Sequence, residues 1–426
     1  MAGPRGPRGR LKADVTPLVP PDTTPEKYVR TAVATLRAHA RKHAFDAART
    51  IAAVRAAATL LLAPDELLSR QLRSQLQTCT GLSAPMVEWG IGTTLASLLH
   101  APLEELVGGL PPAPQPGELI GVILAGNIFC AGLRALTLPL LAGAHVLAKA
   151  ASGEGAFARA WHAALLAADG RVAARLEVLQ FSRSDDTAAR ALCESVDALS
   201  VYGGDETVEQ LGRALGPNAR LIPHGHGVSV AYVTRHALSD LETAQEAAER
   251  VALDIAAYEQ GGCLSPQFVC VDSGAEVTPE RFSELLSHHA LPKCAHMLPP
   301  AVPTLEERAA RLQWQAVAAV RGKLYAHEAH AVSYEHALAA RMSPGGRHVS
   351  VHACGDRSAF RELLEPFAKH LKCVGVAGPA TERAAVAELL AGFSAATTCH
   401  AGEMQTPPFD AHADGRPPFA GLRPTA

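Results

Sequence analysis

One cysteine follows two glycines in the stretch YEQGGCLSPQ, residues 258–267, at the end of an apolar helical pattern. Two roles are open for Cys263. Free cysteine commonly packs as a small apolar residue in a protein core. A cysteine that stays accessible can instead act as a nucleophile, because its thiolate attacks carbonyl carbons. The residue types alone leave both roles open.

Two other polar side chains stand where expected strands end. Asn127 follows the apolar run ELIGVILAG, and Lys149 closes the run AHVLAKA. Parallel sheets bind ligands at the carboxyl ends of their strands. The amide of Asn127 could donate to an oxyanion, and the ammonium of Lys149 could hold ribose hydroxyls or phosphate. Asn is also a common turn residue, and Lys149 could simply extend along the surface.

A pair of glycines separates an expected strand from an expected helix in SVYGGDETVEQLG, which contains Gly203 and Gly204. The free amides at a helix N-terminus favour phosphate, and glycine permits close approach of the backbone. The spacing does not match GxGxxG, and Asp205 would have to turn away from a phosphate. A tight strand-to-helix turn is the alternative explanation, and it needs no ligand.

The rest of the pattern predicts the elements that position these residues. From Pro25 to about Leu106 apolar residues recur every three or four positions, which indicates a helical N-terminal region. After GGLPPAPQPGE, residues 108–118, short apolar runs alternate with helical segments, as in parallel sheets that are covered on both faces. We therefore expect an α/β protein with a Rossmann-type cofactor domain and a second α/β catalytic domain.

The expected division of the chain has four parts. They are a disordered arm over residues 1–24, the helical region with the dinucleotide-binding domain over 25–240, a catalytic domain with Cys263 over 241–395, and a C-terminal segment over 396–426 that packs back on the site or on the cofactor domain.

Composition argues against several classes of function. The 426 residues carry 39 basic and 42 acidic side chains, a net charge of −3, so there is no basic footprint for nucleic acid. Nine cysteines without a CxxC pair argue against a disulfide framework and a metal site, and predict a reducing compartment. No signal-peptide pattern is visible, and Asn127, Arg134 and Pro139 interrupt the apolar window 120–151. We expect a cytoplasmic protein with no membrane span.

In their order along the chain, these pieces resemble the aldehyde dehydrogenase superfamily, and most closely its LuxC-type branch, the fatty acyl-CoA reductases of luminous bacteria. The superfamily has a strand-end Asn, a segment like LAAGNTVVLKPSE, a Gly-containing turn and a GGC or GQC cysteine. Here the same order reads Asn127, LPLLAGAHVLAKAASGE, VYGGDETVEQL and QGGCLSPQ. The tail CHAGEMQTPPFDAHADGRPPFAGL, residues 399–422, is similar to the end of LuxC-type proteins. The resemblance covers about residues 115–422.

The resemblance implies a role for each matching residue. Cys263 would attack an acyl thioester, and hydride from a nicotinamide would reduce the acyl-enzyme to an aldehyde. The Asn127 amide and the Cys263 N–H would stabilise the oxyanion. Gly262 would leave room for the cofactor ring, and Gly203 and Gly204 would lie at the cofactor.

Two departures from the superfamily pattern refine this expectation. Hydrolytic members carry a Glu as general base in an ELGGK-like segment, whereas IPHGHGVSVAYV offers His224 and His226 and no carboxylate. This favours a reductase, in which either histidine could move a proton or be structural. Many NAD-preferring relatives have Glu three residues after the lysine, where this chain has Ser152, which should tolerate a 2′-phosphate. We expect NADPH as cofactor, although Glu154 lies close by in sequence.

The leading expectation is therefore NADPH-dependent reduction of an acyl-CoA or acyl-protein to an aldehyde. An acyl-phosphate reductase of the same superfamily and a catalytically silent scaffold subunit are the alternatives. The resemblance also implies a homo-oligomer, and it is compatible with an acyl-transferring protein partner.

Overall fold

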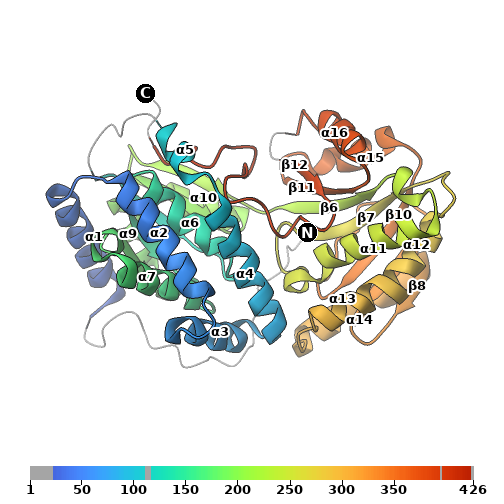
Figure 1. Ribbon diagram of the computed structural model, residues 1–426, viewed down its shortest axis with the longest axis horizontal. Coiled ribbons are helices and arrows are strands. Elements are labelled where there is room, and N and C mark those ends of the chain that lie inside the picture. Colours follow the sequence, from blue (N-terminus) through green and yellow to red (C-terminus); the bar gives the residue numbers. More distant parts are fainter. Residues whose placement is uncertain (1–22, 111–116, 394–395, 424–426) are drawn as a thin grey trace.

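The computed structural model describes residues 23–110, 117–393 and 396–423. The chain forms two lobes, each built around its own sheet (Figure 1). Residues 1–22 of the expected N-terminal arm lie outside the described residues, and Thr24 caps the first helix by accepting from the backbone N–H of Lys27.

The first lobe contains a five-stranded parallel sheet in the order β3-β2-β1-β4-β5. Its strand order reverses between β2 and β4, on either side of β1, which is where doubly wound sheets bind ligands. The elements of this lobe are α1 (Pro25–Lys42), α2 (Ala47–Leu62), α3 (Leu67–Thr80), α4 (Ala84–His100), α5 (Leu103–Gly108), β1 (Leu119–Ile123), α6 (Ala131–Leu141), β2 (His145–Lys149), α7 (Ala156–Ala168), α8 (Gly170–Ala173), β3 (Leu176–Leu179), α9 (Asp186–Ser195), β4 (Ala198–Tyr202), α10 (Asp205–Arg213) and β5 (Arg220–His224).

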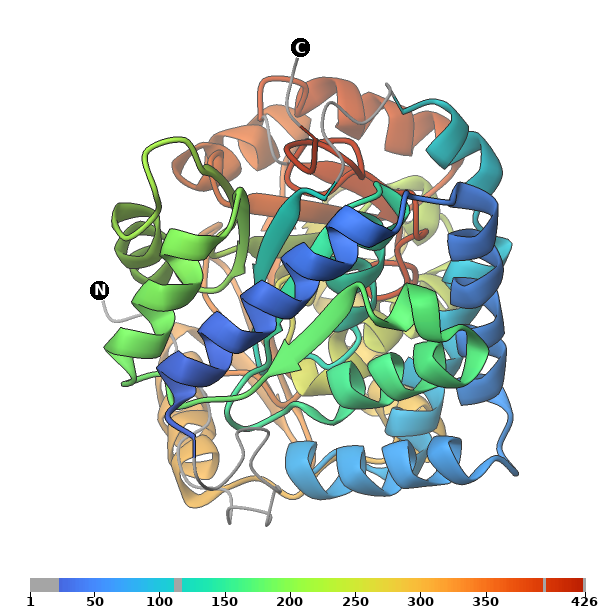
Figure 2. The same ribbon diagram turned by 90° about the vertical axis from the view of Figure 1, so that its left-hand side faces the viewer.

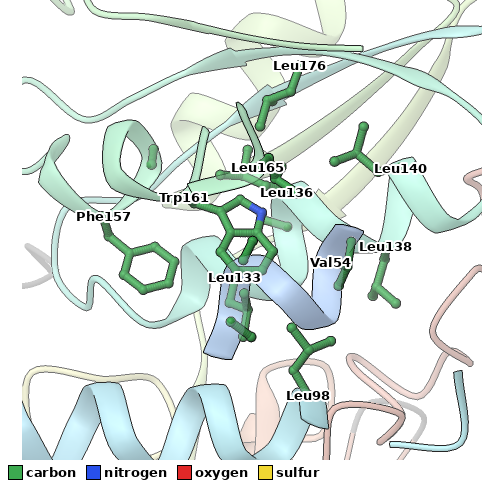
Figure 3. Packing of buried hydrophobic residues seen from close by; sticks show 14 of the residues in the cluster. Val54, Leu98, Leu133, Leu136, Leu138, Leu140, Phe157, Trp161, Leu165 and Leu176 are labelled. Carbon is green, nitrogen blue, oxygen red and sulfur yellow. The ribbon is translucent and has the colours of Figure 1, made fainter. Parts of the chain in front are cut away.

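Both faces of the first sheet are covered by helices, as its continuous apolar strands predict. On one face α1 crosses the sheet and packs with α9 (Figure 2). On the other face α2, α6 and α7 form the largest core, in which Trp161 lies among Val54, Leu133 and Leu136 (Figure 3). Truncation of a buried side chain of this size costs about 3–5 kcal/mol, so this cluster anchors the helical N-terminal region to the sheet.

The second lobe contains a seven-stranded sheet in the order β12-β11-β6-β7-β10-β9-β8, in which only β8 runs antiparallel to its neighbour. Its elements are β6 (Val228–Val233), η1 (His236–Leu238), α11 (Leu241–Ala256), η2 (Ala257–Gln260), β7 (Pro266–Asp272), α12 (Pro279–Leu285), the π-helical turn η3 (Leu286–Ala290), α13 (Leu291–Met297), α14 (Leu305–Arg321), β8 (Gly322–Ala326), β9 (Ala331–Glu335), β10 (His348–Cys354), α15 (Arg357–Leu364), η4 (Glu365–Phe367), β11 (Leu371–Ala377), α16 (Ala380–Leu389) and β12 (Thr397–His400).

Side chains of the second sheet alternate between two cores. In β7, Val269 and Val271 face the cluster formed with α11, α12 and α13, whereas Phe268 and Cys270 face the cluster formed with α15 and α16. The strand β6 belongs to this sheet, because it pairs with β7 and β11. The second sheet therefore begins before residue 240, where the sequence pattern had placed the division between the domains.

The C-terminal segment after β12 returns from the second lobe to the first (Figure 1). Phe409 and Leu422 are buried in the core of the first lobe. Nη2 of Arg134 on α6 donates to the backbone O of Ala411 at 2.5 Å. At its start, the backbone N–H groups of Gly402 and Met404 donate to a buried aspartate of α11. The segment thus bridges the two lobes. In the described ranges, no helix is long and apolar enough to cross a membrane.

Candidate active site

Three consecutive residues with left-handed backbone precede the candidate nucleophile. Tyr258, Glu259 and Gln260 have φ of 53°, 55° and 58°, and Gly261 and Gly262 follow them. Left-handed conformations cost L-residues roughly 1–2 kcal/mol each, so they persist only where surrounding contacts impose them. The turn ends α11 abruptly and delivers Cys263 to the loop before β7.

Buried polar contacts hold this left-handed turn. Glu259 pairs with Arg347 at 2.6 Å, and the Arg347 side chain is only 1% exposed. Gln260 accepts from the backbone N–H of His348 at 2.9 Å and donates through Nε2 to the backbone O of Pro266 at 3.0 Å. The start of β10 therefore clamps the backbone that leads to Cys263.

Cys263 is the exposed cysteine of the chain, since each of the other eight, all within the described residues, is buried or partly buried. Its backbone O accepts from the Ser229 hydroxyl at 2.7 Å. A Cβ at Gly262 would lie 2.3 Å from Cδ1 of Ile128, so glycine lets the nucleophile loop pack directly against the loop that follows β1. The packing role considered for Cys263 does not fit this exposed position.

Asn127 reaches the nucleophile loop from the first lobe. Its Nδ2 donates to the backbone O of Gly261 at 2.9 Å. An amide nitrogen has two donor hydrogens, so the second N–H is available for another acceptor. This hydrogen bond is a direct contact between the first lobe and the loop that carries Cys263.

A charged network lies beside Cys263. Lys372, the second residue of β11, pairs with Asp414 of the C-terminal segment. The other oxygen of Asp414 accepts from Nδ1 of His224 at 2.7 Å and lies 3.3 Å from Nη2 of Arg416. All four side chains are at least two-thirds buried, so these charges interact more strongly than surface pairs would.

The network sets the charge state of each member. Although burial alone would raise it, the hydrogen bond from His224 and the charge of Lys372 hold the pKa of Asp414 well below its usual range. Burial lowers the pKa of His224, despite the opposing effect of Asp414, so its imidazole is neutral at pH 7. An ionised Asp414 requires a hydrogen on Nδ1, and this assigns the acceptor lone pair of His224 to Nε2.

The thiol of Cys263 needs help to ionise. Protein atoms around the exposed thiol displace much of its hydration, and this desolvation raises its pKa. The positive charge of Lys372 lowers the pKa of the thiol, and the negative charge of Asp414 raises it. At neutral pH the thiol is therefore mostly protonated and depends on a base and on Lys372 for its thiolate.

The two histidines of the HGHG segment lie in different environments. His224 stacks on Tyr202, with ring centroids 4.1 Å apart and planes at 10°, and joins the Asp414 network. His226 is exposed, and its backbone N–H donates to Asp205 at the start of α10. The contacts thus connect His224 with the surroundings of Cys263 and His226 with the start of α10.

A second group of polar residues gathers at the carboxyl ends of β2 and β3. The ammonium of Lys149 lies 5.5 Å from the centroid of the Phe181 ring, and Ser152 Oγ donates to the backbone O of Phe181 at 3.3 Å. Burial and the neighbouring Arg183 lower the pKa of Lys149. Glu154 points away into the lobe, where it is buried and accepts from the backbone N–H of Phe157 at 3.0 Å. This edge of the sheet is cationic.

The glycine pair lies at the start of α10. Gly204 is the N-cap residue and has no side chain to satisfy the first amides of the helix. A Cβ on Gly204 would meet nothing within 4 Å, and one on Gly203 would only make an ordinary contact with Thr207 at 3.5 Å. Arg183 links the two groups by donating to Thr207 Oγ1 at 2.8 Å. Close packing therefore does not explain the glycines, and no side chain caps the first amides of α10.

Sequence reasoning missed four residues of these groups. Lys372, Asp414, Arg183 and Arg347 reach their places only through the fold. Asp414 carried a weak signal, the ADG tripeptide in the tail, whereas Lys372 stands at the start of an ordinary apolar strand. Among the side chains that the structure describes, no group of three or more His, Cys, Asp or Glu is arranged to hold a metal ion.

Comparisons with known proteins agree with this architecture. The family model for LuxC acyl-CoA reductase matches residues 113–422. Indole-3-acetaldehyde dehydrogenase AldA of P. syringae, solved with NAD+ and IAA, is 18% identical with a TM-score of 0.69, over 88% of this chain and 81% of that one. The NAD-dependent benzaldehyde dehydrogenase of Corynebacterium glutamicum is 17% identical with a TM-score of 0.65, over 89% and 88%. The aldehyde dehydrogenase KauB of Pseudomonas aeruginosa is 17% identical with a TM-score of 0.69, over 88% and 81%.

The comparison with curated proteins returned no match. The solved structures share the fold with this chain at low sequence identity. The family match covers more than half of the residues and includes Asn127, Cys263 and the tail with Asp414. The chain therefore belongs to the LuxC acyl-CoA reductase family, has the aldehyde dehydrogenase fold, and is an oxidoreductase.

Proposed function

We propose that this enzyme reduces an acyl thioester, an acyl-CoA or acyl-protein, to the aldehyde with NADPH, through an acyl group carried on Cys263. The observation that supports this most strongly is the surroundings of Cys263. Its exposed thiol lies on a clamped loop between the Asn127 amide and the Lys372–Asp414 pair. A thiol, an oxyanion donor and a nearby base are the requirements of acyl transfer.

Acylation begins when the Cys263 thiolate attacks the thioester carbonyl. The Nε2 of His224 accepts the thiol proton, directly or through water, because the ionised Asp414 fixes its tautomer. The second N–H of Asn127 and the backbone N–H of Cys263 donate to the tetrahedral oxyanion, an interaction worth about 3–4 kcal/mol in comparable sites. The intermediate collapses, the C–S bond to the leaving thiol breaks, and the proton on His224 goes to that thiolate.

The same network disfavours hydrolysis of the acyl-cysteine. A hydrolytic site needs a carboxylate that is free to deprotonate water. Asp414 carries a strongly lowered pKa and already accepts from Lys372, His224 and Arg416, so it is a very weak base. The acyl group therefore awaits reduction. The overall balance is acyl thioester, NADPH and one proton consumed, with aldehyde, thiol and NADP+ produced.

The residues at the first sheet fit NADPH. When bound, NADPH supplies the hydride that reduces the acyl carbon. Lys149, Ser152 and Arg183 offer two cations and a hydroxyl to the ribose and its 2′-phosphate, and the uncapped amides of α10 after Gly204 suit the pyrophosphate. The carboxylate of Glu154, which would repel a 2′-phosphate, points inward. Gly262, next to Cys263, is also proposed to lie near the nicotinamide, although its missing Cβ makes room for Ile128 of the loop after β1.

A coupled assay on the purified chain tests the proposal. With acyl-CoAs of several chain lengths, we expect one free thiol to appear for each NADPH oxidised. Cys263→Ala should abolish labelling by radioactive acyl-CoA and leave NADPH binding nearly unchanged. The matched control is Cys79→Ala, a partly exposed cysteine on α3, which should keep full labelling.

Other outcomes point to the alternatives. Turnover of an acyl phosphate and of no thioester identifies an acyl-phosphate reductase. Labelling that persists in Cys263→Ala places the nucleophile elsewhere. A chain that binds neither NADPH nor acyl-CoA is a silent scaffold.

A further inference from the structure

The helix α14 has its polar and apolar faces reversed. Only Ala318 of its 17 residues is buried. The face toward the protein carries Arg311, Trp314 and Gln315, and Gln315 Nε2 bonds to the ring of His348 at 2.9 Å. Surface helices normally turn their apolar stripe toward the core. Here the core side of the helix carries Arg311 and Gln315 beside Trp314 and Ala318, whereas its large aliphatic residues face outward.

The outward face carries a continuous apolar seam. Leu305, Leu312 and Val320 are 83%, 59% and 88% exposed, and Val302, just before the helix, is 84% exposed. With Ala309, Ala316 and Ala319, which are also exposed, the seam residues follow a spacing of alternating four and three. The seam is Val302, Leu305, Ala309, Leu312, Ala316 and Ala319, with Val320 at its edge. This is the pattern by which helices pair along their length.

We propose that this seam packs antiparallel against the same helix of a second copy of this chain. In that register a large residue meets an alanine at every level. Leu305 lies opposite Ala316 of the copy, and Ala309 lies opposite Leu312. A parallel pair would instead oppose leucine to leucine and leave gaps between alanines, so the alternation of sizes is complementary to itself only in the antiparallel sense.

The charges along α14 favour the same arrangement. Glu306 and Glu307 occupy its first turn, whereas residues 312–320 carry no charge and Arg321 ends the helix. An antiparallel copy places the acidic turn of each helix alongside the half of its partner that has no carboxylate. A parallel copy would bring Glu306 of both chains to the same level at the edge of the seam, where like charges repel.

The position of α14 leaves the seam accessible. The helix packs against β8 and β9, and β8 is the outermost strand of the second sheet. Figure 1 shows α14 along the lower rim of the second lobe, and the large seam residues of the helix are exposed. A two-fold axis across the middle of the helix, between Ala310 and Arg311, brings both seams together.

Sedimentation velocity on the full chain tests the interface. We expect the wild type to form a species of twice the 44.6 kDa chain mass. Leu312→Asp should raise the dissociation constant of the dimer by at least about 100-fold, because each charge loses water at the centre of the seam. The matched control is Leu166→Asp on α7, where the leucine is 58% exposed, and it should leave the dimer intact.

A size swap tests the antiparallel register. Ala309→Leu places a leucine against Leu312 of the other copy, and the two-fold axis repeats this contact. The overpacking at both places should weaken the dimer at least about tenfold. Adding Leu312→Ala restores one large and one small residue at each level, so the double variant should regain most of the affinity. Circular dichroism confirms that each variant keeps its helices.

Three results overturn the proposal. A wild type that stays monomeric at all concentrations leaves the seam to a different protein. A dimer that is unaffected by Leu312→Asp forms through another surface. Failure of the swapped variant to recover excludes the antiparallel register.

Discussion

The two sheets support the candidate site in different ways. On the side of the second sheet, Cys263 follows a left-handed turn that a buried ion pair and paired amides hold in place. On the side of the first sheet, Lys149 and Ser152 stand at strand ends with few fixed partners, and Gly204 opens onto free space. The Cys263 side is therefore held by buried contacts, whereas the Lys149 side has few such contacts.

This difference matches two chemical tasks. A nucleophile must meet a carbonyl within a narrow range of distance and angle, so backbone strain held by buried contacts is useful there. A dinucleotide is bound over a long surface by several hydrogen bonds, each of modest strength, so no single contact has to be rigid. Substitutions in the clamp should therefore have larger effects than substitutions among the residues proposed to bind the cofactor.

The largest effect is expected when the clamp is broken. Arg347→Met strands the buried carboxylate of Glu259 and should lower the free energy of unfolding by about 3 kcal/mol. The turn then relaxes from its left-handed conformation, and Cys263 moves from its place beside Asn127. Single-turnover release of CoA should slow at least about 100-fold per folded molecule, while the KM for acyl-CoA changes little. Denaturant titration and rapid mixing measure the two effects.

A double variant separates stability from positioning. Arg347→Met with Glu259→Gln removes both charges, so most of the lost stability should return. Acylation should stay slow, because the contact that holds the turn is still missing. If the rate recovers together with the stability, Arg347 has only a structural role and the clamp does not position the nucleophile.

A smaller effect is expected from the charge beside the thiol. Desolvation of the thiol by surrounding protein atoms raises the pKa of Cys263 and the charge of Lys372 lowers it, so loss of Lys372 raises it further. Thiolate is the reactive form, so Lys372→Met should slow acylation about tenfold at pH 7 and lose this defect as the pH rises above the thiol pKa. The measurement is the rate of CoA release against pH. Lys369→Met, an exposed lysine nearby, is the control. A defect of equal size at every pH argues against an electrostatic role.

The same comparison explains what the sequence could predict. Cys263, the preceding glycines and Asn127 are recognisable because the roles proposed for them depend on residue type and order along the chain. The left-handed turn before Cys263 has no such signal, because Tyr258, Glu259 and Gln260 are ordinary residues that tertiary contacts force into an unusual conformation. Local patterns cannot report a conformation that distant residues impose.

The distant members of the site follow the same rule. Lys372 and Asp414 approach Cys263 only because β11 lies beside β6 and the C-terminal segment returns across both lobes. The sequence likewise could not choose between His224 and His226, which differ in their contacts and not in their type. The fold class was predictable from alternating strands and helices, whereas the domain boundary depended on which sheet β6 joins.

The smallest effect is expected on the open side. Arg183 is exposed, lies close enough to Lys149 to lower its pKa, and bonds Thr207 at the start of α10. If it binds the 2′-phosphate, Arg183→Ala should raise the KM for NADPH about tenfold and leave that for NADH unchanged, because only NADPH carries the extra charge. Steady-state kinetics with both cofactors measure this ratio, and Arg190→Ala, an exposed arginine on α9, is the control.

An equal loss with both cofactors would mean that Arg183 orders α10 through Thr207 and does not bind the phosphate. A wild type that prefers NADH would show instead that an open cationic edge does not select the phosphate, and that cofactor choice depends on groups outside this edge.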